Sequence, residues 1–366
     1  MTSRQRFALT MAHRAPDRPP LDLGATSLTG MRPGVQQALC QVLGFGGEPV
    51  IGHAGTDERL LEWAGTDFRA VGGIVSLPSP HTARLADKTV VDCWGVRHEV
   101  VDGESQITGH PLRHASRADL AAFPWPEPRI DERLLATWEA RARELRRADE
   151  YVVIGEHPVF GILELGCWMC GYDGFLLRLA AEPEFVRDFF DRVLQIQLSV
   201  VEQYYSVLGP YLDLTMSGDD FGEQRGPLLS PEMFSREVAP YFRERIRRTK
   251  ELAGCYYWHH TCGSVAALLD PLLDCGVEIL NPVQTSATGM EPEQLKARFG
   301  DRLVFWGAVD VQQFLRLASP AEVTTGVREL VRVLGADGGY VSAPGHQVQD
   351  DVPPENLIAW IEAVRG

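Results

Sequence analysis

Hydrophobic positions along the chain form short apolar runs separated by longer amphipathic stretches. The short runs are rich in Val, Ile and aromatic residues, which favour β-strands. The longest stretch, 173–207, repeats apolar residues at the spacing of one helix face. The predicted strands are 20–24, 70–77, 151–155, 212–216, 255–260, 277–281, 303–307 and 339–343.

Alternating strands and helices indicate parallel strands joined by right-handed crossovers. Eight predicted strands in 366 residues fit a single α/β (β/α)₈ TIM barrel, although a doubly wound sheet has the same alternation. No linker, repeat or low-complexity segment divides residues 1–366. We therefore expect one barrel domain.

Three segments add local predictions to this alternation of strands and helices. Residues 88–112 alternate about the turn sequence VVDGES, which predicts an antiparallel excursion, and 123–133 then leads back to a helix. Ser230 could cap a helix, although Met233 occupies the place of the Glu that would complete a capping box. The segment 353–366 has proline at a helix start and glycine at its end.

Composition narrows the class of protein. The chain is 45% hydrophobic with a mean hydropathy of −0.12, and no apolar run of about 18 residues predicts a membrane span. The basic N-terminus lacks a long apolar core, so we expect no signal peptide. A net charge of −15 argues against a nucleic-acid partner, because phosphate binding needs a basic face. Seven irregularly spaced cysteines favour a reducing cytoplasm over a disulfide framework.

Polar residues follow five consecutive predicted strands, where a barrel would gather them at its mouth. All are hydrogen-bonding or metal-ligating types, which solvated loops alone would not concentrate at these places. They are Asp219, Asp220, Glu223 and Arg225; His259, His260 and Cys262; Asn281 and Gln284; Asp310 and Gln312; and His346, Gln349 and Asp350.

The H-x-C pair His260 and Cys262 is a candidate for half of a catalytic metal site. Catalytic zinc takes three protein ligands and keeps one position open, so the third ligand must come from another strand. His346 is the natural candidate. His259 would point to the opposite face of its strand and is expected to pack structurally. A buried strand end without metal is the alternative.

Two further pairs have a structural and a chemical interpretation. Asp219 and Asp220 could act in acid–base chemistry or cap a helix, and burial close together would raise one pKa. Cys167 and Cys170 have the C-x-x-C spacing of redox pairs. Their apolar surroundings and the lack of a second C-x-x-C favour packing.

Taken together, these motifs resemble the uroporphyrinogen decarboxylase superfamily, which also contains corrinoid-dependent methyltransferases. The resemblance covers nearly the whole chain and implies a single (β/α)₈ barrel, in agreement with the strand pattern. The motifs are HRAPDRPPLDLG, SGDDFGEQRGPLLSPEMF, HHTCGSV, GVEILNPVQ, FWGAVDVQ and GGYVSAPGHQVQDDVPPENL.

Two chemistries occur within this superfamily. True decarboxylases are similar to one another at an arginine-rich stretch that grips tetrapyrrole carboxylates, but here LDLGATSLTGMRPG contains only Arg32. The methyltransferases resemble this chain in H-x-C, whose His and Cys bind zinc with a later cysteine. His346 stands at that third place, as in the decarboxylases. The resemblance thus favours the methyltransferase branch and leaves open whether His346 binds zinc or substrate.

The resemblance implies zinc-assisted transfer of a methyl group between a corrinoid such as methylcobalamin and a small thiol or tetrahydrofolate. It also suggests a docked corrinoid protein and a homodimer. The alternatives are a metal-free decarboxylase of a small carboxylated or tetrapyrrole-like substrate, and a non-catalytic corrinoid or metal carrier. The roles expected are metal binding by His260, Cys262 and His346, catalysis by Asp219 and Asp220, and substrate or cofactor binding by Glu223, Asn281, Gln284, Asp310, Gln312 and Gln349.

Overall fold

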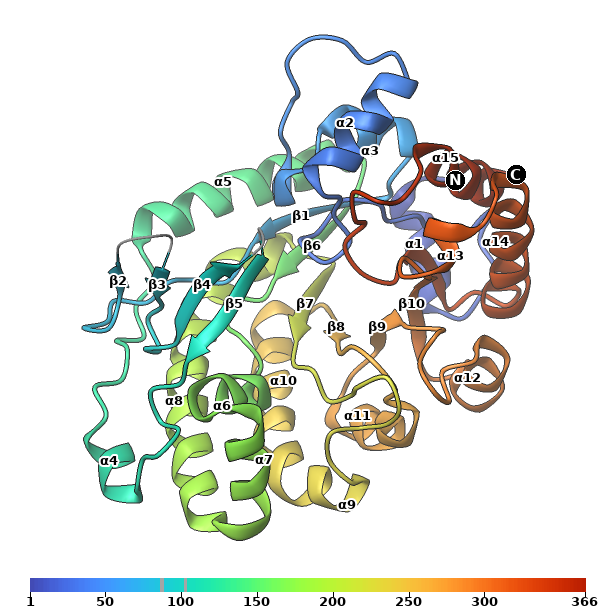
Figure 1. The fold of residues 1–366 in the computed structure, drawn as a ribbon. Helices are drawn as coiled ribbons and strands as arrows, with labels where there is room; N and C mark the ends of the chain where they lie inside the picture. Colours follow the sequence, from blue (N-terminus) through green and yellow to red (C-terminus); the bar gives the residue numbers. More distant parts are fainter. Residues whose placement is uncertain (86–88, 102–103) are drawn as a thin grey trace.

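Seven parallel strands form one curved sheet in the computed structural model, which describes residues 1–85, 89–101 and 104–366 (Figure 1). Their order in space follows the chain without reversal, which excludes the doubly wound alternative and confirms the TIM-barrel-like fold. The strands are β1 (Phe68–Gly72), β6 (Val152–Glu156), β7 (Leu214–Gly218), β8 (Tyr256–His260), β9 (Ile279–Val283), β10 (Val304–Val309) and β11 (Tyr340–Pro344).

The first predicted strand, 20–24, is not a regular strand. The Asp22 N–H donates to the Ser342 carbonyl at 2.9 Å, and the Asp67 N–H donates to the Leu21 carbonyl at 2.9 Å. These bonds join the segment to β11 on one side and to the residue before β1 on the other. The prediction of eight strands is therefore corrected to seven strands and one connecting segment that lies between the two sheet edges.

Helices surround the sheet (Figure 1). No helix in the described ranges is long and apolar enough to cross a membrane. The α-helices are α1 (Ser3–Met11), α2 (Pro33–Val42), α3 (Glu58–Ala64), α4 (Arg117–Ala122), α5 (Glu132–Ala148), α6 (Ile162–Cys170), α7 (Tyr172–Ala181), α8 (Pro183–Leu208), α9 (Pro231–Met233), α10 (Ala239–Ala253), α11 (Leu269–Cys275), α12 (Pro292–Phe299), α13 (Phe314–Leu317), α14 (Pro320–Gly335) and α15 (Pro354–Arg365).

The predicted helix 173–207 is interrupted and forms α7 and α8. Glu182 leaves the helical conformation, with φ −130° and ψ 59°, immediately before Pro183. Proline has no N–H to donate and disfavours a helical conformation in the residue before it. The apolar periodicity continues across the break, which is why the pattern alone predicted one helix.

Other predicted helix boundaries are confirmed. The Ser230 hydroxyl accepts the Met233 N–H at 3.2 Å and caps α9. The last helix, α15, begins at Pro354, and Gly366 follows its end. The segment 123–133 leads into α5.

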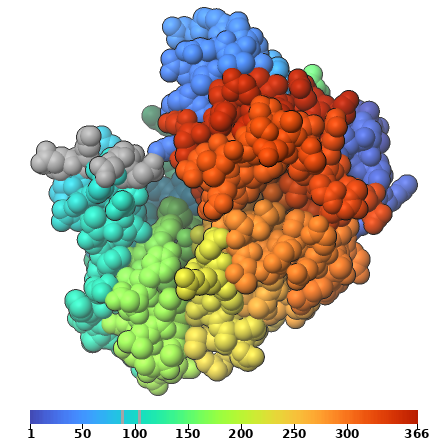
Figure 2. Space-filling model, turned by 45° about the vertical axis from the view of Figure 1, so that its right-hand side comes forward, coloured from blue at the N-terminus to red at the C-terminus, as the bar shows by residue number. Residues whose placement is uncertain are grey.

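The predicted antiparallel excursion is confirmed as a second sheet. It contains β2 (Ala83–Arg84), β3 (Thr89–Val91), β4 (Arg97–Val101) and β5 (Glu104–Gly109). The predicted turn within VVDGES falls on residues 102–103, and the start of the predicted excursion falls on residue 88; both lie outside the described residues. Figure 2 shows a hollow between this sheet, in cyan, and the C-terminal segments, in red.

Aromatic side chains fill the barrel interior. Trp258 and Trp306 point inward from β8 and β10 and stack with ring centroids 4.3 Å apart. Helix α1 inserts Phe7 against Phe68 at the opposite end from the mouth, with ring centroids 5.6 Å apart. The cavities described below therefore lie at the carboxyl ends of the strands.

Candidate metal centre

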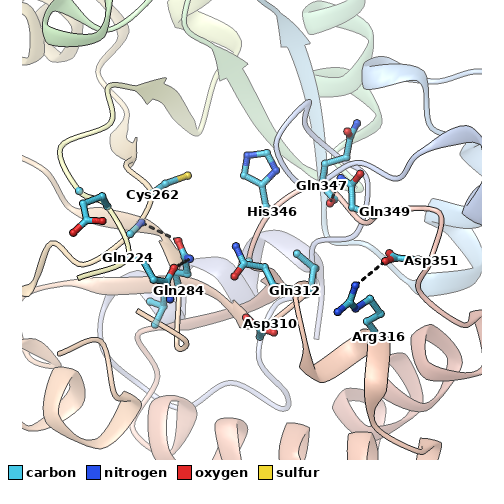
Figure 3. A pocket seen from close by; sticks show the side chains of 16 residues that line it. Gln224, Cys262, Gln284, Asp310, Gln312, Arg316, His346, Gln347, Gln349 and Asp351 are labelled. Carbon is cyan, nitrogen blue, oxygen red and sulfur yellow. Dashed lines mark hydrogen bonds and ion pairs between the residues drawn. The ribbon is translucent and has the colours of Figure 1, made fainter. Parts of the chain in front are cut away.

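Three potential metal ligands converge at the barrel mouth. His260 ends β8, Cys262 follows it by two residues, and His346 follows β11. Their ligand atoms all lie within 4.8 Å of one another. The Cys262 Sγ is 3.3 Å from the His260 Nε2, and Figure 3 shows the Cys262 side chain directed toward His346. The structure thus brings together the three residues that the sequence predicted as a metal site.

Asn281 fixes the orientation of the His260 ring. The His260 Nδ1 lies 2.6 Å from the Asn281 Oδ1, and the Asn281 side-chain amide donates to the Trp306 carbonyl at 3.5 Å. This pairing assigns the proton of neutral His260 to Nδ1. The Nε2 lone pair is then directed toward Cys262, which is the arrangement that a metal-binding imidazole needs.

The loop after β8 bends so that both H-x-C ligands face the same point. The Cys262 N–H donates to the Asp220 carboxylate at 2.7 Å, and the Gly263 N–H donates to the Gln284 side chain at 2.9 Å. Gly263 has φ +81°, in the left-handed region that favours glycine. A strand that continued straight through this point would separate the two ligands.

The electrostatics of the three ligands suit a divalent cation. Burial, followed by the carboxylates of Asp220 and Glu164, raises the pKa of the Cys262 thiol. Desolvation, followed by the charge of His260, lowers the pKa of His346, although this residue is exposed to solvent. A neutral imidazole offers a lone pair, and a bound cation would favour the thiolate. Two nitrogens and one sulfur form a donor set that zinc accepts.

His259 occupies the opposite face of β8, as predicted. Its ring is fully buried between Phe221, with centroids 5.3 Å apart, and Phe242, with centroids 4.7 Å apart. Burial, followed by the positive charge of Arg245, lowers the pKa of His259 well below its ordinary value. The ring is therefore neutral and packs between the barrel and its helices.

Asp219 and Asp220 are separated by the same alternation. Asp219 is fully buried, and its carboxylate accepts three N–H groups at the start of α6, from Ile162, Leu163 and Glu164, at 2.8–3.1 Å. Asp220 faces the mouth, with its Oδ1 3.9 Å from the His260 Nε2. A catalytic role for either residue stays a prediction. The contacts of Asp219 favour a structural role, whereas Asp220 lies beside the metal ligands.

Two cavities meet at His346, which lines both of them. The first, which we name the amide cavity, has a volume of about 510 Å³ and is lined by Gln224, Gln284, Gln312, Gln347 and Gln349 together with Cys262, Asp310 and other residues (Figure 3). The second, which we name the acidic cavity, has a volume of about 320 Å³ and is lined by Glu156, Glu164, Asp220, His260 and other residues.

Most of the predicted binding residues reach the amide cavity. Glu223, Gln284, Asp310, Gln312 and Gln349 line it. Within this group, Asp310 also accepts the Gln313 and Phe314 N–H groups, and Gln284 also holds the loop after β8. Asn281 lies behind His260 and lines neither cavity.

Arg225 and Asp350 lie outside the lining of both cavities. The Asp350 carboxylate accepts the Val35 N–H at 2.9 Å, in the first turn of α2. Cys167 and Cys170 are fully buried in α6. All seven cysteines are free, and burial raises the pKa of the Cys170 thiol to about 12. This placement agrees with the packing interpretation of the C-x-x-C pair.

Glu156 and Glu164 are cavity residues that the sequence reasoning missed. Glu156 is the last residue of β6, a predicted strand, so the rule applied to later strand ends would have found it. Glu164 lies in the first turn of α6, where an acidic residue is ordinary in any helix. Only the docking of the start of α6 on the loop after β7 brings Glu164 beside Asp220.

A parallel barrel with converging ligands and polar side chains at its carboxyl mouth is the architecture of a TIM-barrel enzyme. Residues 89–366 match the model of the uroporphyrinogen decarboxylase (URO-D) family, and the chain belongs to that family. The match covers the sheet strands from β6 to β11 and all three candidate metal ligands.

Relatives in this superfamily have two activities. The chain is 24% identical over 291 residues to uroporphyrinogen decarboxylase of Alkalilimnicola ehrlichii, covering 75% of this chain and 73% of that protein. It is 25% identical over 177 residues to methylcobamide:CoM methyltransferase MtaA of Methanosarcina barkeri, covering 48% of each. A solved methyltransferase from Methanosarcina mazei shares the fold, with TM-score 0.65, 16% identity and coverage of 100% of this chain and 98% of that chain. The protein is thus an enzyme of a superfamily that contains decarboxylases and methyltransferases.

Proposed function

We propose that this protein is a methyltransferase that moves a methyl group between a corrinoid and a small thiol, with zinc held by His260, Cys262 and His346. The observation that carries the proposal is the convergence of these three ligand atoms within 4.8 Å at the barrel mouth. Similarity to MtaA supports the same branch of the superfamily.

Zinc bound at these residues would act as a Lewis acid that lowers the pKa of a thiol ligand. Asn281 would keep the proton of His260 on Nδ1 and leave Nε2 as the ligand atom. Asp220 lies beside the ligands, and we assign to its carboxylate the acceptance of the thiol proton. Asp219 would be a positioning residue, because its hydrogen bonds fix the start of α6, on which Glu164 lies.

The proposed reaction balances as a methyl-cation transfer. The thiol loses its proton, its sulfur forms a bond to the methyl carbon, and the cobalt–carbon bond breaks. The electron pair of that bond stays on cobalt, which changes from Co(III) to Co(I). The products are a methyl thioether, the reduced corrinoid and one proton.

Tetrahydrofolate is a second candidate acceptor because of the composition of the amide cavity. Its glutamine side chains offer both donors and acceptors, which match the amide and amine groups of a reduced pterin. The two acceptors can be compared by incubating the protein with methylcobalamin and either a thiol or tetrahydrofolate. Loss of the methylcobalamin spectrum is the expected result, and no demethylation with any acceptor would contradict methyl transfer.

Metal binding is tested separately by elemental analysis of the freshly purified full chain. We expect one zinc per chain, lost in Cys262→Ala and His346→Ala. Cys40→Ala and the exposed His114→Ala are matched controls outside both cavities and should retain it. Zinc retained by Cys262→Ala would overturn the ligand set.

Decarboxylation is the second candidate function, because decarboxylases are among the relatives that match about three quarters of the chain. It predicts carbon dioxide release that does not depend on metal. A polycarboxylated tetrapyrrole fits the mouth poorly: among the described residues lining the two cavities, Arg316 is the single arginine or lysine, and it lies 3.3 Å from Asp351.

The third candidate function is that of a carrier, which would bind corrinoid or metal without either reaction. A docked corrinoid protein, a homodimer and a cytoplasmic location stay predictions.

A further inference from the structure

The two cavities at the barrel mouth differ in charge although they share His346. The acidic cavity receives three carboxylates from three different elements: Glu156 from the end of β6, Glu164 from α6 and Asp220 from the loop after β7. No lysine or arginine occurs among the described residues that line it. The amide cavity also has three carboxylates, from Glu223, Asp310 and Asp351, but one of them is paired with Arg316, and five neutral glutamine side chains line the same wall.

Three basic residues at or near the acidic cavity, Arg245, His53 and His157, offset little of its carboxylate charge. The charge of Arg245 acts on the pKa of Glu164 only as the smallest of five causes. Arg245 is 1% exposed, lies outside the lining and donates to the Phe160 carbonyl at 2.9 Å. The His53 Nε2 lies 3.5 Å from the Glu156 carboxylate, at one end of the group. His157 is buried, and its pKa is lowered well below the ordinary value, chiefly by desolvation. It therefore contributes no charge near neutral pH.

Glu164 and Asp220 form one unit beside the metal ligands. The Glu164 carboxylate accepts the Asp220 N–H, and Asp220 lies 3.9 Å from the His260 Nε2. Burial and the adjacent carboxylates raise the pKa of Glu164 well above its ordinary value. A bound cation would relieve this repulsion, whereas an anion would add to it. His260, which is nine-tenths buried, lines the same cavity, so a ligand there can reach the metal site.

We propose that the acidic cavity is the subsite of the methyl acceptor and that it selects a small aminothiol over an anionic thiol of the same length. The ammonium group of the aminothiol would lie against Glu156 and Glu164. The sulfur of the same molecule would face His260, Cys262 and His346. The volume of about 320 Å³ suits a small acceptor, and we place the methyl donor at the larger amide cavity, of about 510 Å³. This inference rests on the proposed methyl transfer.

Three thiols that differ only in their terminal group test the selection: cysteamine, 2-mercaptoethanol and 2-mercaptoethanesulfonate. Their dissociation constants are measured by titration calorimetry on the zinc-loaded full chain at low salt. Because opposite charges attract and like charges repel across a partly buried site, cysteamine should bind at least about tenfold more tightly than the sulfonate. The neutral thiol should fall between them.

Variants identify the carboxylates responsible. Glu164→Gln and Glu156→Gln should each reduce the cysteamine preference at least about threefold, because each replaces a carboxylate, which a bound ammonium group would favour in its ionised form, with a neutral amide. Glu150→Gln makes the same change in charge at an exposed position before β6 and should leave the preference unaltered. The proposal is overturned if the sulfonate binds as tightly as cysteamine, or if neither cavity variant changes the ratio.

Failure of this inference can be separated from failure of the proposed function. Demethylation of methylcobalamin with equal efficiency by all three thiols would retain methyl transfer and overturn the subsite. No demethylation, together with binding of 2-(methylthio)ethylamine that is weakened in Glu164→Gln, would overturn methyl transfer and retain the cation subsite. If no ammonium ligand binds to either the zinc-loaded or the metal-free chain, the subsite is overturned.

Discussion

The closed end of the barrel and its mouth are built from the same strands but serve opposite purposes. On β8, Trp258 points inward and stacks on Trp306, and two residues later His260 points inward and meets Cys262. Below, aromatic and aliphatic side chains pack against one another, and Phe7 closes the end. Above, the side chains border cavities and carry lone pairs or charge. Trp258 and His260 are only two residues apart on β8, yet the first packs in the core and the second belongs to the candidate metal site.

The largest expected effect is on the closed end. Trp258→Ala should lower the free energy of unfolding by about 3–5 kcal/mol, because a fully buried aromatic side chain leaves a cavity that the barrel cannot fill. Denaturant unfolding monitored by circular dichroism measures this loss. Leu177→Ala, at a position 67% exposed, is the control and should change stability by less than about 0.5 kcal/mol. If Trp258→Ala instead abolishes zinc binding in a fully stable protein, the division between the two ends is wrong.

The second effect is a pH dependence located below the mouth. Asp22 is fully buried and accepts the Trp306 indole N–H at 3.1 Å. Desolvation, the largest cause, raises its pKa from 3.8 to about 6. The unfolded chain therefore releases this proton near pH 4 while the native protein retains it, so this contribution to stability falls as pH rises from about 4 to about 6.

The loss of folding free energy linked to Asp22 is about 3 kcal/mol once the pH is above both pKa values. Asp22→Asn retains an acceptor for Trp306 and cannot ionise, so the stability difference between wild type and variant should change with pH in this window. Unfolding midpoints at pH 4, 5, 6 and 7 measure it. A stability difference that is constant across these four pH values would contradict the raised pKa of Asp22.

The third expected effect distinguishes a structural role of Asp219 from a catalytic role of Asp220. Asp219→Ala should lower the free energy of unfolding by about 1–3 kcal/mol, because three N–H groups at the start of α6 lose their acceptor. Asp220→Asn should change stability much less and instead reduce methyl transfer. Thermal unfolding and turnover measured on the same samples separate the two roles. Asp188→Ala, at an exposed ion pair, is the stability control.

The smallest expected effect concerns a residue that supports the mouth. Asn281→Ala should weaken zinc binding by about tenfold to a hundredfold, because the His260 ring loses the acceptor that fixes its tautomer. Competition with a chelator of known affinity measures the change. Gln195→Ala, exposed on α8, should leave zinc affinity unaltered. Equal zinc affinity in Asn281→Ala would show that the ring is held by its packing alone.

Much of the fold could be predicted because each strand is a local apolar run. Six of the eight predicted strands exist within about two residues of their predicted bounds, and the antiparallel sheet was also recognised. The strand predicted at 70–77 exists as β1 but ends at Gly72. The segment 20–24 has the same apolar character, but its backbone bonds go to Ser342 and Asp67, which lie far away in the sequence. The break at Pro183 was missed because periodicity continued through it, although proline chemistry offered the signal.

The separation of His259 from His260 and the pairing of His260 with Cys262 were contained in the sequence, because side-chain alternation is a local property of any strand. The assignment of Asp219 to α6 and of Asp220 to the metal ligands was decided only when helix and barrel packed together. The same holds for the meeting of Glu156, Glu164 and Asp220, which come from three separate elements. Charge in a cavity depends on distances through space, and the order of residues along the chain does not contain those distances.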